Sequence, residues 1–546
     1  MNSLKPMLLT CLKSYDKSQF IKDVTAGIVV AIIALPLSIA LALASGVGPE
    51  AGIFTAIVAG FVISALGGSC VQIAGPTAAF ATIVAGIVAR DGMDGLIIAT
   101  IMAGIFLILM GLFHFGSLIK FIPYTITTGF TSGIAVTIVI VQLKDFFGVT
   151  YPDGVKPIET TEKMKAFVQN ISSVNTDALI VGIVSLAILI LAPYIFKKVP
   201  GSLIAVIVGI LMVQFLPLKV STIGNLYTIS NSLPSFHMPA IRFSTISASV
   251  SNAFTIAVLA AIESLLSCVV ADGMINSKHR SDMELVAQGA GNIASALFGG
   301  IPATGAIART AANIKNGGRT PIAGMVHSVT LIIVLVVLMP HAGMIPMPTI
   351  AAILFIVAYN MCQWRTFRDL VRTAPKSDIL VLIVTFVLTV IFDLVVAIEI
   401  GMVLACLLFI KRMGEETHAD SWVYTDDDTP DIDEHLQKLP LQIRVYEITG
   451  PLFFGAADAI EHIVVKDFTS CLVLRMRGVP ALDSTAMNAL QNLVKTCEGK
   501  GITLVFSHVN EQPMHVMEKA GFVELVGKEN FQSNISAALK RAEEVI

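Results

Sequence analysis

Two charged side chains of this chain lie within long apolar runs. Glu263 occurs inside the run 253–267, and Arg309 lies inside a second one. Charged residues in the middle of an apolar span are costly to bury and are usually functional. Glu263 could take up and release a proton, with the hydroxyl of Ser267 one turn further along the same helical face. Arg309 could hold an oxyanion or add positive field. The structural alternative is an ion pair between the two, or contacts with helix ends.

Small and hydroxyl-bearing residues interrupt two apolar stretches. The interruptions at 75–80 and 302–310 each follow a double glycine and the triplet Ser-Ala-Leu, and they lie about 230 positions apart. Gly/Pro-interrupted spans at matching positions of two halves indicate a transporter's binding site. A helix that starts inside a membrane leaves its first N–H groups free, and these groups attract anions. The two interruptions therefore predict an anion site.

The predicted anion contacts lie at and just after these interruptions. They are Thr77, Ala78, Thr304, Gly305, Ala306 and Arg309. The threonine hydroxyls could equally cap the two helix starts. The small residues could equally allow tight packing of helices.

The elements that position these residues are membrane spans. The chain has 546 residues, of which 55% are hydrophobic and only 14% charged, and its mean hydropathy is +0.80. Such a composition excludes a soluble globular protein. The apolar runs before position 412 predict about fourteen spans, including the two interrupted ones. Basic loops recur on one side, which is then the cytoplasmic side of the inner membrane, together with both termini. The first run has no cleavage site and is interpreted as a retained span.

The spans are predicted to form two related halves. The span with Pro36 precedes the first interruption as the span with Glu263 precedes the second. Both interrupted helices must meet near the middle of the membrane, which favours two seven-span halves of opposite orientation.

Hydropathy falls sharply after Lys411. The acidic residues 413–440 are predicted to be a linker, and from 441 short strands alternate with amphipathic helices. This alternation predicts a small α/β domain. The sequence Asp483-Ser484-Thr485 precedes one of its helices and is interpreted as an N-cap, with a phosphorylatable hydroxyl as the alternative. The predicted organisation is 1–22 as a cytoplasmic segment, 23–412 as the membrane domain, 413–440 as the linker and 441–546 as the α/β domain.

Several function classes lack their motifs. The seven cysteines are scattered, without a C-x-x-C pair, so neither a disulfide framework nor a metal site is predicted. No P-loop, dinucleotide-binding fingerprint, zinc spacing or catalytic set is found. We therefore expect no enzymatic activity, no cofactor and no nucleic-acid partner.

The chain resembles the SulP anion permease family, which includes sulfate, bicarbonate and dicarboxylate permeases. The resemblance covers nearly the whole chain. Its motifs are the Pro36 span, Gly75-Pro76-Thr77, 129–135, 261–266, 302–313 and a terminal STAS domain with Asp483-Ser484-Thr485. The runs 305–313 and 450–454 look most similar to the bacterial branch with the C4-dicarboxylate permease.

This resemblance implies a seven-plus-seven inverted repeat, divided into a core and a gate domain, with an anion held between two half-helix starts. Residues that match the family's site positions are Thr77, Gly305, Ala306 and Ile307 on the half-helices, Leu37 and Leu41 as gating residues, and Glu263 and Ser267 as the acidic and hydroxyl positions. Ile307 stands where the sodium-coupled branch has an oxygen ligand. Because an isoleucine side chain has no oxygen for Na⁺, we expect coupling to protons through Glu263.

The sequence therefore predicts a secondary-active anion transporter in a lipid membrane, with an elevator mechanism and H⁺ symport. The resemblance implies a homodimer, and the STAS domain could bind a cytosolic protein. One alternative is a nucleobase–cation symporter, which shares this architecture. Another is a membrane sensor or scaffold that signals through the STAS domain. The sequence leaves open whether the anion is sulfate, bicarbonate or a C4-dicarboxylate.

Overall fold

The computed structural model divides the chain into two compact units, Met1–Met402 and Val403–Ile546. It describes residues 4–117, 123–152, 157, 159–195, 200–230, 232–239, 243–392, 394–422, 440, 442–461, 463 and 468–546.

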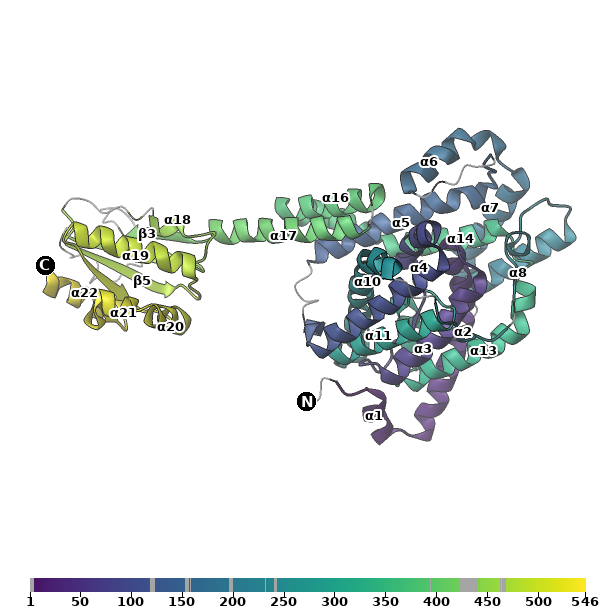
Figure 1. Cartoon of the computed structure of the whole chain (residues 1–546), viewed down its shortest axis with the longest axis horizontal. Helices are drawn as coiled ribbons and strands as arrows, with labels where there is room; N and C mark the ends of the chain where they lie inside the picture. Colours follow the sequence, from purple (N-terminus) through teal and green to yellow (C-terminus); the bar gives the residue numbers. More distant parts are fainter. Residues whose placement is uncertain are drawn as a thin grey trace. The chain divides into compact units, whose positions relative to one another are not determined.

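The first unit is helical (Figure 1). Its described helices are α1 (Leu8–Cys11), η1 (Leu12–Ser14), α2 (Lys17–Ala44), α3 (Pro49–Leu66), α4 (Ala78–Leu112), α5 (Tyr124–Phe147), α6 (Thr160–Gln169), η3 (Ile171–Ser173), α7 (Thr176–Ile195), α8 (Gly201–Phe215), α9 (Ile223–Leu226), α10 (Phe243–Ile275), α11 (Ser281–Leu297), α12 (Ile307–Lys315), α13 (Ile322–Ala342), α14 (Met347–Cys362), α15 (Trp364–Thr373), α16 (Lys376–Ile391) and the start of α17 (Leu394–Glu415). Within the described residues, eight helical segments are long and apolar enough to cross a membrane, and Gly201–Phe215 is a shorter apolar helix. The number of fourteen spans stays a prediction.

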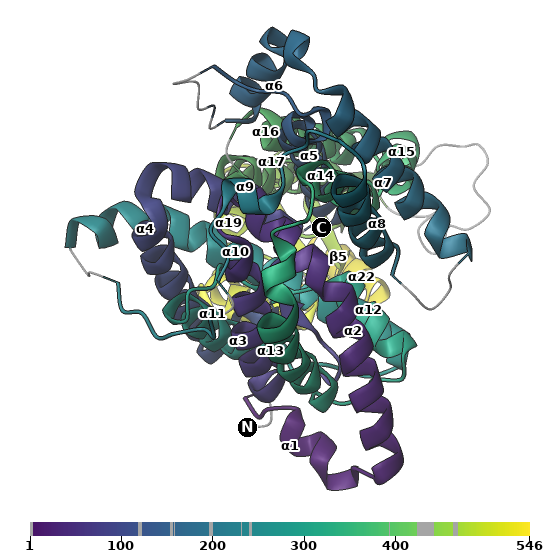
Figure 2. The same ribbon diagram turned by 90° about the vertical axis from the view of Figure 1, so that its right-hand side faces the viewer.

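The helices of this unit pack in two groups (Figure 2). Helices α2, α3, α4, α10, α11, α12 and α13 contact one another and form the group that we call the core group. Helices α5, α7, α8, α14 and α16 pack together as the gate group. Contacts of α2 with α14 and α8, and of α4 with α5, join the two groups.

Corresponding helices of the two halves of this unit have corresponding packing partners. Helix α4 packs on α10 and α11, as α13 packs on α2 and α3. In the gate group, α5 packs on α16 as α14 packs on α7. Two chain segments that were unrelated would not share this set of neighbours, so the packing agrees with the predicted repeat.

Two short strands lie between the repeated helices. Strand β1 (Ala74–Gly75) pairs antiparallel with β2 (Thr304–Gly305). Helix α4 follows the first strand and α12 follows the second, so the two helices leave the pair in opposite directions. Helix α4 contains a break of its own, because Gly92 has a φ of 71°. It therefore consists of a half-helix that starts at Ala78 and a second helix beyond Gly92.

The second unit contains a five-stranded sheet in the order β3-β4-β5-β6-β7. The strands are β3 (His418–Trp422), β4 (Ile443–Thr449), β5 (Cys471–Gly478), β6 (Thr503–Ser507) and β7 (Phe531–Gln532), and the helices are α18 (Asp458–Glu461), α19 (Ser484–Gly499), α20 (Glu511–Lys519), α21 (Phe522–Val526), η5 (Lys528–Asn530) and α22 (Ile535–Val545). Strand β3 is antiparallel to β4, and the other pairs are parallel. Each face of the sheet carries its own hydrophobic cluster, as an α/β sandwich requires.

Two details of this unit differ from the expectations. Strand β3 lies within the stretch 413–440 that was expected to be a linker, because its residues gain their order from pairing with β4 rather than from an apolar pattern. The run 453–465 has the pattern of a helix, but residues 453–457 form a bend and turns, and α18 begins at Asp458. Residues 423–439, 441, 462 and 464–467 lie outside the described part of the chain.

Candidate functional site

The two interruptions meet in space. Ala74 pairs with Gly305, and Gly75 pairs with Thr304. Helix α4 has Thr77 as its N-cap residue and α12 has Ala306, and neither side chain caps its helix by a hydrogen bond. The N–H groups of both first turns are therefore free of side-chain caps and can face a negatively charged ligand.

Thr77 bonds to Glu263 instead of to its own helix. Its Oγ1 donates a hydrogen bond of 2.9 Å to Oε2 of Glu263. Both side chains are only half-buried. The contact places the carboxylate from α10 at the start of the first half-helix, where it occupies the electropositive helix end. The capping role that the sequence allowed for Thr77 is thus not the one that its side chain has.

Ser264, the next residue on α10, contacts the second interruption. Its Oγ lies 2.7 Å from Oγ1 of Thr304 and accepts a hydrogen bond of 3.1 Å from the amide of Gly305. Thr304 therefore belongs to the β-pair and does not cap α12. Adjacent residues of one helix thus contact both interruptions. Ser264 could not be singled out from sequence beyond its place in the 261–266 motif, because a serine in a span has many ordinary roles.

Arg309 is the third residue of α12 and therefore lies in its first turn. Its side chain is 1% exposed. Nη2 donates to Oγ of Ser38 at 3.3 Å and to the carbonyl of Pro76 at 3.2 Å. Among the described residues, Nε and Nη1 have no hydrogen-bond partner. Within the part of the chain that the structure describes, no carboxylate forms an ion pair with Arg309, so its charge lies behind the two helix starts without a neutralising partner.

The remaining predicted residues surround this arrangement. Ala78 is buried, Ala306 is half-buried, and the side chain of Ile307 is 43% exposed. Leu41 is buried in the hydrophobic core, and Leu37 packs against that core beside Ser38. They form an apolar flank next to the helix starts.

Ser267 lies one turn beyond Glu263 on α10. Its Oγ is buried and has no hydrogen-bond partner among the described residues. It therefore lies one turn from Glu263 without bonding to it.

The buried carboxylate of Glu284, which was not predicted from sequence, binds the loop that precedes the first interruption. Glu284 accepts hydrogen bonds from the amides of Gly68 and Ser69 at 2.9 and 3.2 Å. Its other oxygen accepts from Nε2 of Gln72 at 2.7 Å and of Gln288 at 2.9 Å. These contacts hold the loop that leads into β1. No sequence signal marked Glu284, since an acidic residue in the first turn of a helix is ordinary.

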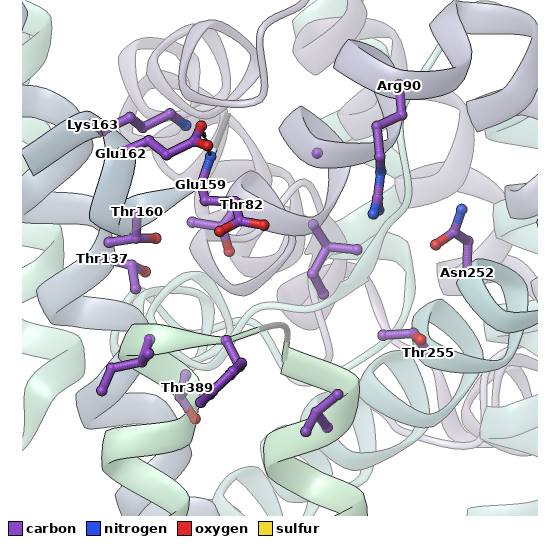
Figure 3. Close-up of a pocket in the computed structure, with 15 residues that line it drawn as sticks. Thr82, Arg90, Thr137, Glu159, Thr160, Glu162, Lys163, Asn252, Thr255 and Thr389 are labelled. Carbon is purple, nitrogen blue, oxygen red and sulfur yellow. Dashed lines mark hydrogen bonds between the residues drawn. The ribbon is translucent and has the colours of Figure 1, made fainter. Parts of the chain in front are cut away.

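A cavity of about 460 Å³ lies between the core group and the gate group (Figure 3). Its lining residues include Thr82, Gly86 and Arg90 from α4, Asn252 and Thr255 from α10, Thr137 from α5, Thr389 from α16, and Glu159, Thr160, Glu162 and Lys163 at and in α6.

The cavity is lined by the same faces of α4 and α10 that carry Ala78 and Glu263. Thr82 and Gly86 lie one and two turns beyond Ala78 on α4, and Thr255 precedes Glu263 by two turns on α10, so each set shares a helical face. Figure 3 shows Arg90 on the opposite side of the cavity from Lys163. The polar lining continues outward from the site along both helices.

In the α/β unit, Asp483 is the N-cap that the sequence predicted. Its side chain accepts hydrogen bonds from the amides of Thr485 and Ala486, each at 2.9 Å. Its second oxygen accepts from the amide of Phe454 at 2.9 Å. The carboxylate therefore joins the start of α19 to the segment after β4.

The described residues contain no group of three or more His, Cys, Asp or Glu that could hold a metal ion.

Comparisons with known proteins agree with this architecture. Residues 20–385 match the model of the sulfate permease family, and residues 438–538 match the STAS domain. The chain is 39% identical to "Putative sulfate transporter YvdB" of Bacillus subtilis (strain 168), over 95% of this chain and 97% of that protein. It is 31% identical to the bicarbonate transporter BicA of Picosynechococcus sp. (strain ATCC 27264 / PCC 7002 / PR-6), over 95% and 94%.

Solved structures share the fold. The structure of SLC26A9 has a TM-score of 0.87 at 19% identity and covers 99% of this chain and 93% of that one. The transmembrane domain of a cyanobacterial BicA has a TM-score of 0.63 at 29% identity, over 72% and 98%. The family match does not favour the nucleobase–cation symporter alternative, and the relatives are transporters rather than enzymes. The chain belongs to the sulfate permease family and is a membrane anion transporter with a C-terminal STAS domain.

Proposed function

We propose that this protein is a secondary-active symporter that carries one anion together with a proton across the inner membrane. The observation that carries the proposal is the hydrogen bond between Thr77 and Glu263, at the start of a half-helix that pairs with a second one. It joins a group that can hold a proton to a place that can hold an anion.

The anion binds between the starts of α4 and α12. Free N–H groups of the first turns, at Ala78 and at Ile307, point to the ligand, and the small residues Gly305 and Ala306 allow it to approach the backbone closely. Arg309 is too deeply buried for ready contact with a ligand and adds positive field from behind. The names of the relatives favour sulfate or bicarbonate as the anion, and a C4-dicarboxylate fits the same chemistry.

Coupling between the proton and the anion follows because the ionised Glu263 and the anion compete for the start of α4. An ionised Glu263 places negative charge at the start of α4 and repels an incoming anion, since like charges oppose each other at short range. Protonation of Glu263 removes this charge and leaves the helix end to the anion. Protonation and anion binding therefore favour each other, and by thermodynamic linkage the effect is reciprocal. Ile307 offers no oxygen to Na⁺, which favours the proton as the coupled ion.

The core group moves against the gate group as an elevator. All elements that form the site belong to the core group, whereas the cavity is lined by both groups. A shift of the core group would carry the site as one body and change which part of α4 and α10 faces this cavity. The positive-inside pattern places the termini and the STAS domain in the cytoplasm. The STAS domain is a surface for a cytosolic protein, and the transporter acts as a homodimer.

The proposal is tested by uptake into proteoliposomes with an imposed pH gradient. Labelled sulfate, bicarbonate and succinate are compared, each with and without the gradient. We expect one of them to accumulate above its equilibrium level only when the outside is acidic. Accumulation that needs Na⁺, or no accumulation with any gradient, would contradict the coupling.

Glu263→Gln provides the matched variant, because glutamine keeps the size of the side chain and cannot exchange a proton. We expect counterflow of the anion to persist in this variant, since counterflow needs no net proton movement, and gradient-driven accumulation to be lost. Uptake that still follows the pH gradient in Glu263→Gln would exclude Glu263 as the coupling group.

A further inference from the structure

Two cysteines that are distant in sequence lie side by side in the first unit. Sγ of Cys11, at the end of α1, lies 3.6 Å from Sγ of Cys70, in the loop between α3 and β1. Both residues are half-buried rather than enclosed. Within the described residues, no other two cysteines are joined by a hydrogen bond.

Both partners are held in place by other contacts. The amide of Met7 donates to the carbonyl of Gly67 at 2.8 Å. Arg280 donates to the carbonyl of Lys5 at 2.8 Å and to Oγ1 of Thr10 at 3.0 Å. The loop before Cys70 is held by Glu284, as described above. A disulfide requires an S–S length near 2.05 Å, so the sulfurs need to approach by only about 1.5 Å. The short helix α1 can supply this shift, since it contains four residues.

The local hydrogen bonds favour reaction at Cys70. Its thiol has a lowered pKa, mainly because the thiol of Cys11 donates a hydrogen bond to it, with further help from Ser277 and the charge of Arg280. The same hydrogen bond, together with burial, raises the pKa of Cys11. Of the two, Cys70 is therefore the one that reaches the thiolate form, which is the nucleophile in disulfide exchange.

We propose that Cys11 and Cys70 are a reversible dithiol–disulfide site, which small disulfides such as glutathione disulfide oxidise, and which fastens the N-terminal helix to the loop before the first half-helix. The proposal does not depend on the coupling mechanism above, because its readout is chemical rather than transport.

The reaction has two exchange steps. The thiolate of Cys70 attacks one sulfur of glutathione disulfide, breaks its S–S bond and releases one glutathione thiolate. Cys11 no longer donates to a thiolate once this mixed disulfide forms, so it can lose its proton to water. Its sulfur then attacks Sγ of Cys70, forms the internal S–S bond and releases the second glutathione. Two protein thiols and one disulfide thus become one internal disulfide and two glutathione thiols.

The experiment treats the full chain in membranes with glutathione disulfide, blocks free thiols with a maleimide and identifies the digested peptides by mass spectrometry. We expect a linked peptide that contains Cys11 and Cys70, the loss of two maleimide additions, and recovery of both after dithiothreitol. Cys362 and Cys406 form no hydrogen bond with another cysteine in the described residues, and they serve as internal controls that should give no linked peptide. Recovery of Cys11 and Cys70 as free thiols, or as two separate glutathione adducts, would overturn the proposal.

Single variants test the order of the steps. In Cys11→Ser the reaction should stop at the mixed disulfide, with glutathione on Cys70. In Cys70→Ser, Cys11 should form the glutathione adduct more slowly than Cys70 does in Cys11→Ser, because burial and the charge of Asp23 raise the pKa of the Cys11 thiol. Equal glutathione adducts in the two variants would overturn the assignment of Cys70 as the attacking residue. The measurement on the unchanged chain decides the main proposal even if a variant folds poorly.

Discussion

At the scale of single residues, the site combines charges of three kinds. Two helix starts and Arg309 are electropositive, and Glu263 is the only carboxylate that bonds to either half-helix start in the described residues. An anion therefore meets positive charge from three directions and negative charge from one. Because that one group can be neutralised by a proton, the balance of charge in the site depends on a single titratable side chain.

Arg309→Gln should strongly weaken transport without removing the protein from the membrane. The substitution removes the positive field and the charged hydrogen bonds to Ser38 and Pro76. A unit charge that acts through space at an effective dielectric constant of about 20 contributes on the order of 1–3 kcal/mol, which corresponds to a loss of anion affinity on the order of tenfold to a hundredfold. Concentration-dependent uptake in proteoliposomes measures this.

Arg309→Lys is the matched variant, because lysine keeps the charge but lacks the planar fork of donors. We expect it to fall between the unchanged chain and Arg309→Gln. Equal uptake by Arg309→Gln and the unchanged chain, at equal protein content, would show that the positive field is not needed.

At the scale of elements, the β1–β2 pair and the loops around it align the two half-helices. Strands of two residues each cannot be stable alone. Their position is set by neighbours from distant parts of the chain. Asn292 bonds to both the amide and the carbonyl of Ala303, at 2.8 and 2.9 Å. On the other side, Glu284 holds the loop that leads into β1. The geometry of the site is thus determined from α11 as well as from the half-helices.

Glu284→Gln tests this support. An amide group in place of the carboxylate would turn an NH₂ donor towards the donors of Gly68, Ser69, Gln72 or Gln288 and leave some of them unsatisfied. An unsatisfied buried donor costs about 1–3 kcal/mol. We expect a clear fall in the melting temperature of the detergent-purified protein. Asp94→Asn is the control, because Asp94 is exposed and should leave the melting temperature unchanged. No difference between the two variants would mean that Glu284 does not hold the loop.

Gly75→Ala tests the approach of Arg309 to β1. A Cβ at this position would collide with Nη1 of Arg309. The guanidinium would have to move away from the helix starts, so uptake should fall while the amount of folded protein in the membrane changes little. Gly273→Ala is the matched control, since a Cβ there meets nothing within 4 Å. Full uptake by Gly75→Ala would show that the position of Arg309 is not important.

The part of this arrangement that depends on residue type alone was predictable from sequence. The two interruptions, Glu263 and Arg309 stand out because polar or helix-breaking residues are rare in apolar spans. The partners could not be predicted. Ser264 and Glu284 are ordinary residues for their positions, and their contacts join residues about 40 and more than 200 positions apart. Strand β3 was missed for the same reason, since its order comes from pairing with β4.

At the scale of the membrane unit, helices of one group form the site, whereas helices of both groups line the cavity. The core group alone forms the site, and both groups line the cavity. If the core group moves as one body, the polar surface of α4 beyond Ala78 alternates between exposure and contact with the gate group. A residue of α6 on the opposite wall does not undergo this change. The movement therefore predicts different chemical accessibility for two residues of the same cavity.

Thr82→Cys and Lys163→Cys measure this difference. Thr82 lies on α4 and Lys163 on α6, and both line the cavity. A membrane-impermeant thiosulfonate is added to sealed, oriented vesicles, with and without a transported anion and a pH gradient. We expect the labelling rate of Thr82→Cys to change several-fold with transport conditions and its labelling to block uptake, because a bulky group would prevent closure. Lys163→Cys should be labelled at a constant rate. The unchanged chain gives the background from native cysteines. Equal and constant rates for both variants would contradict movement of the core group against the gate group, even if the anion site itself is correct.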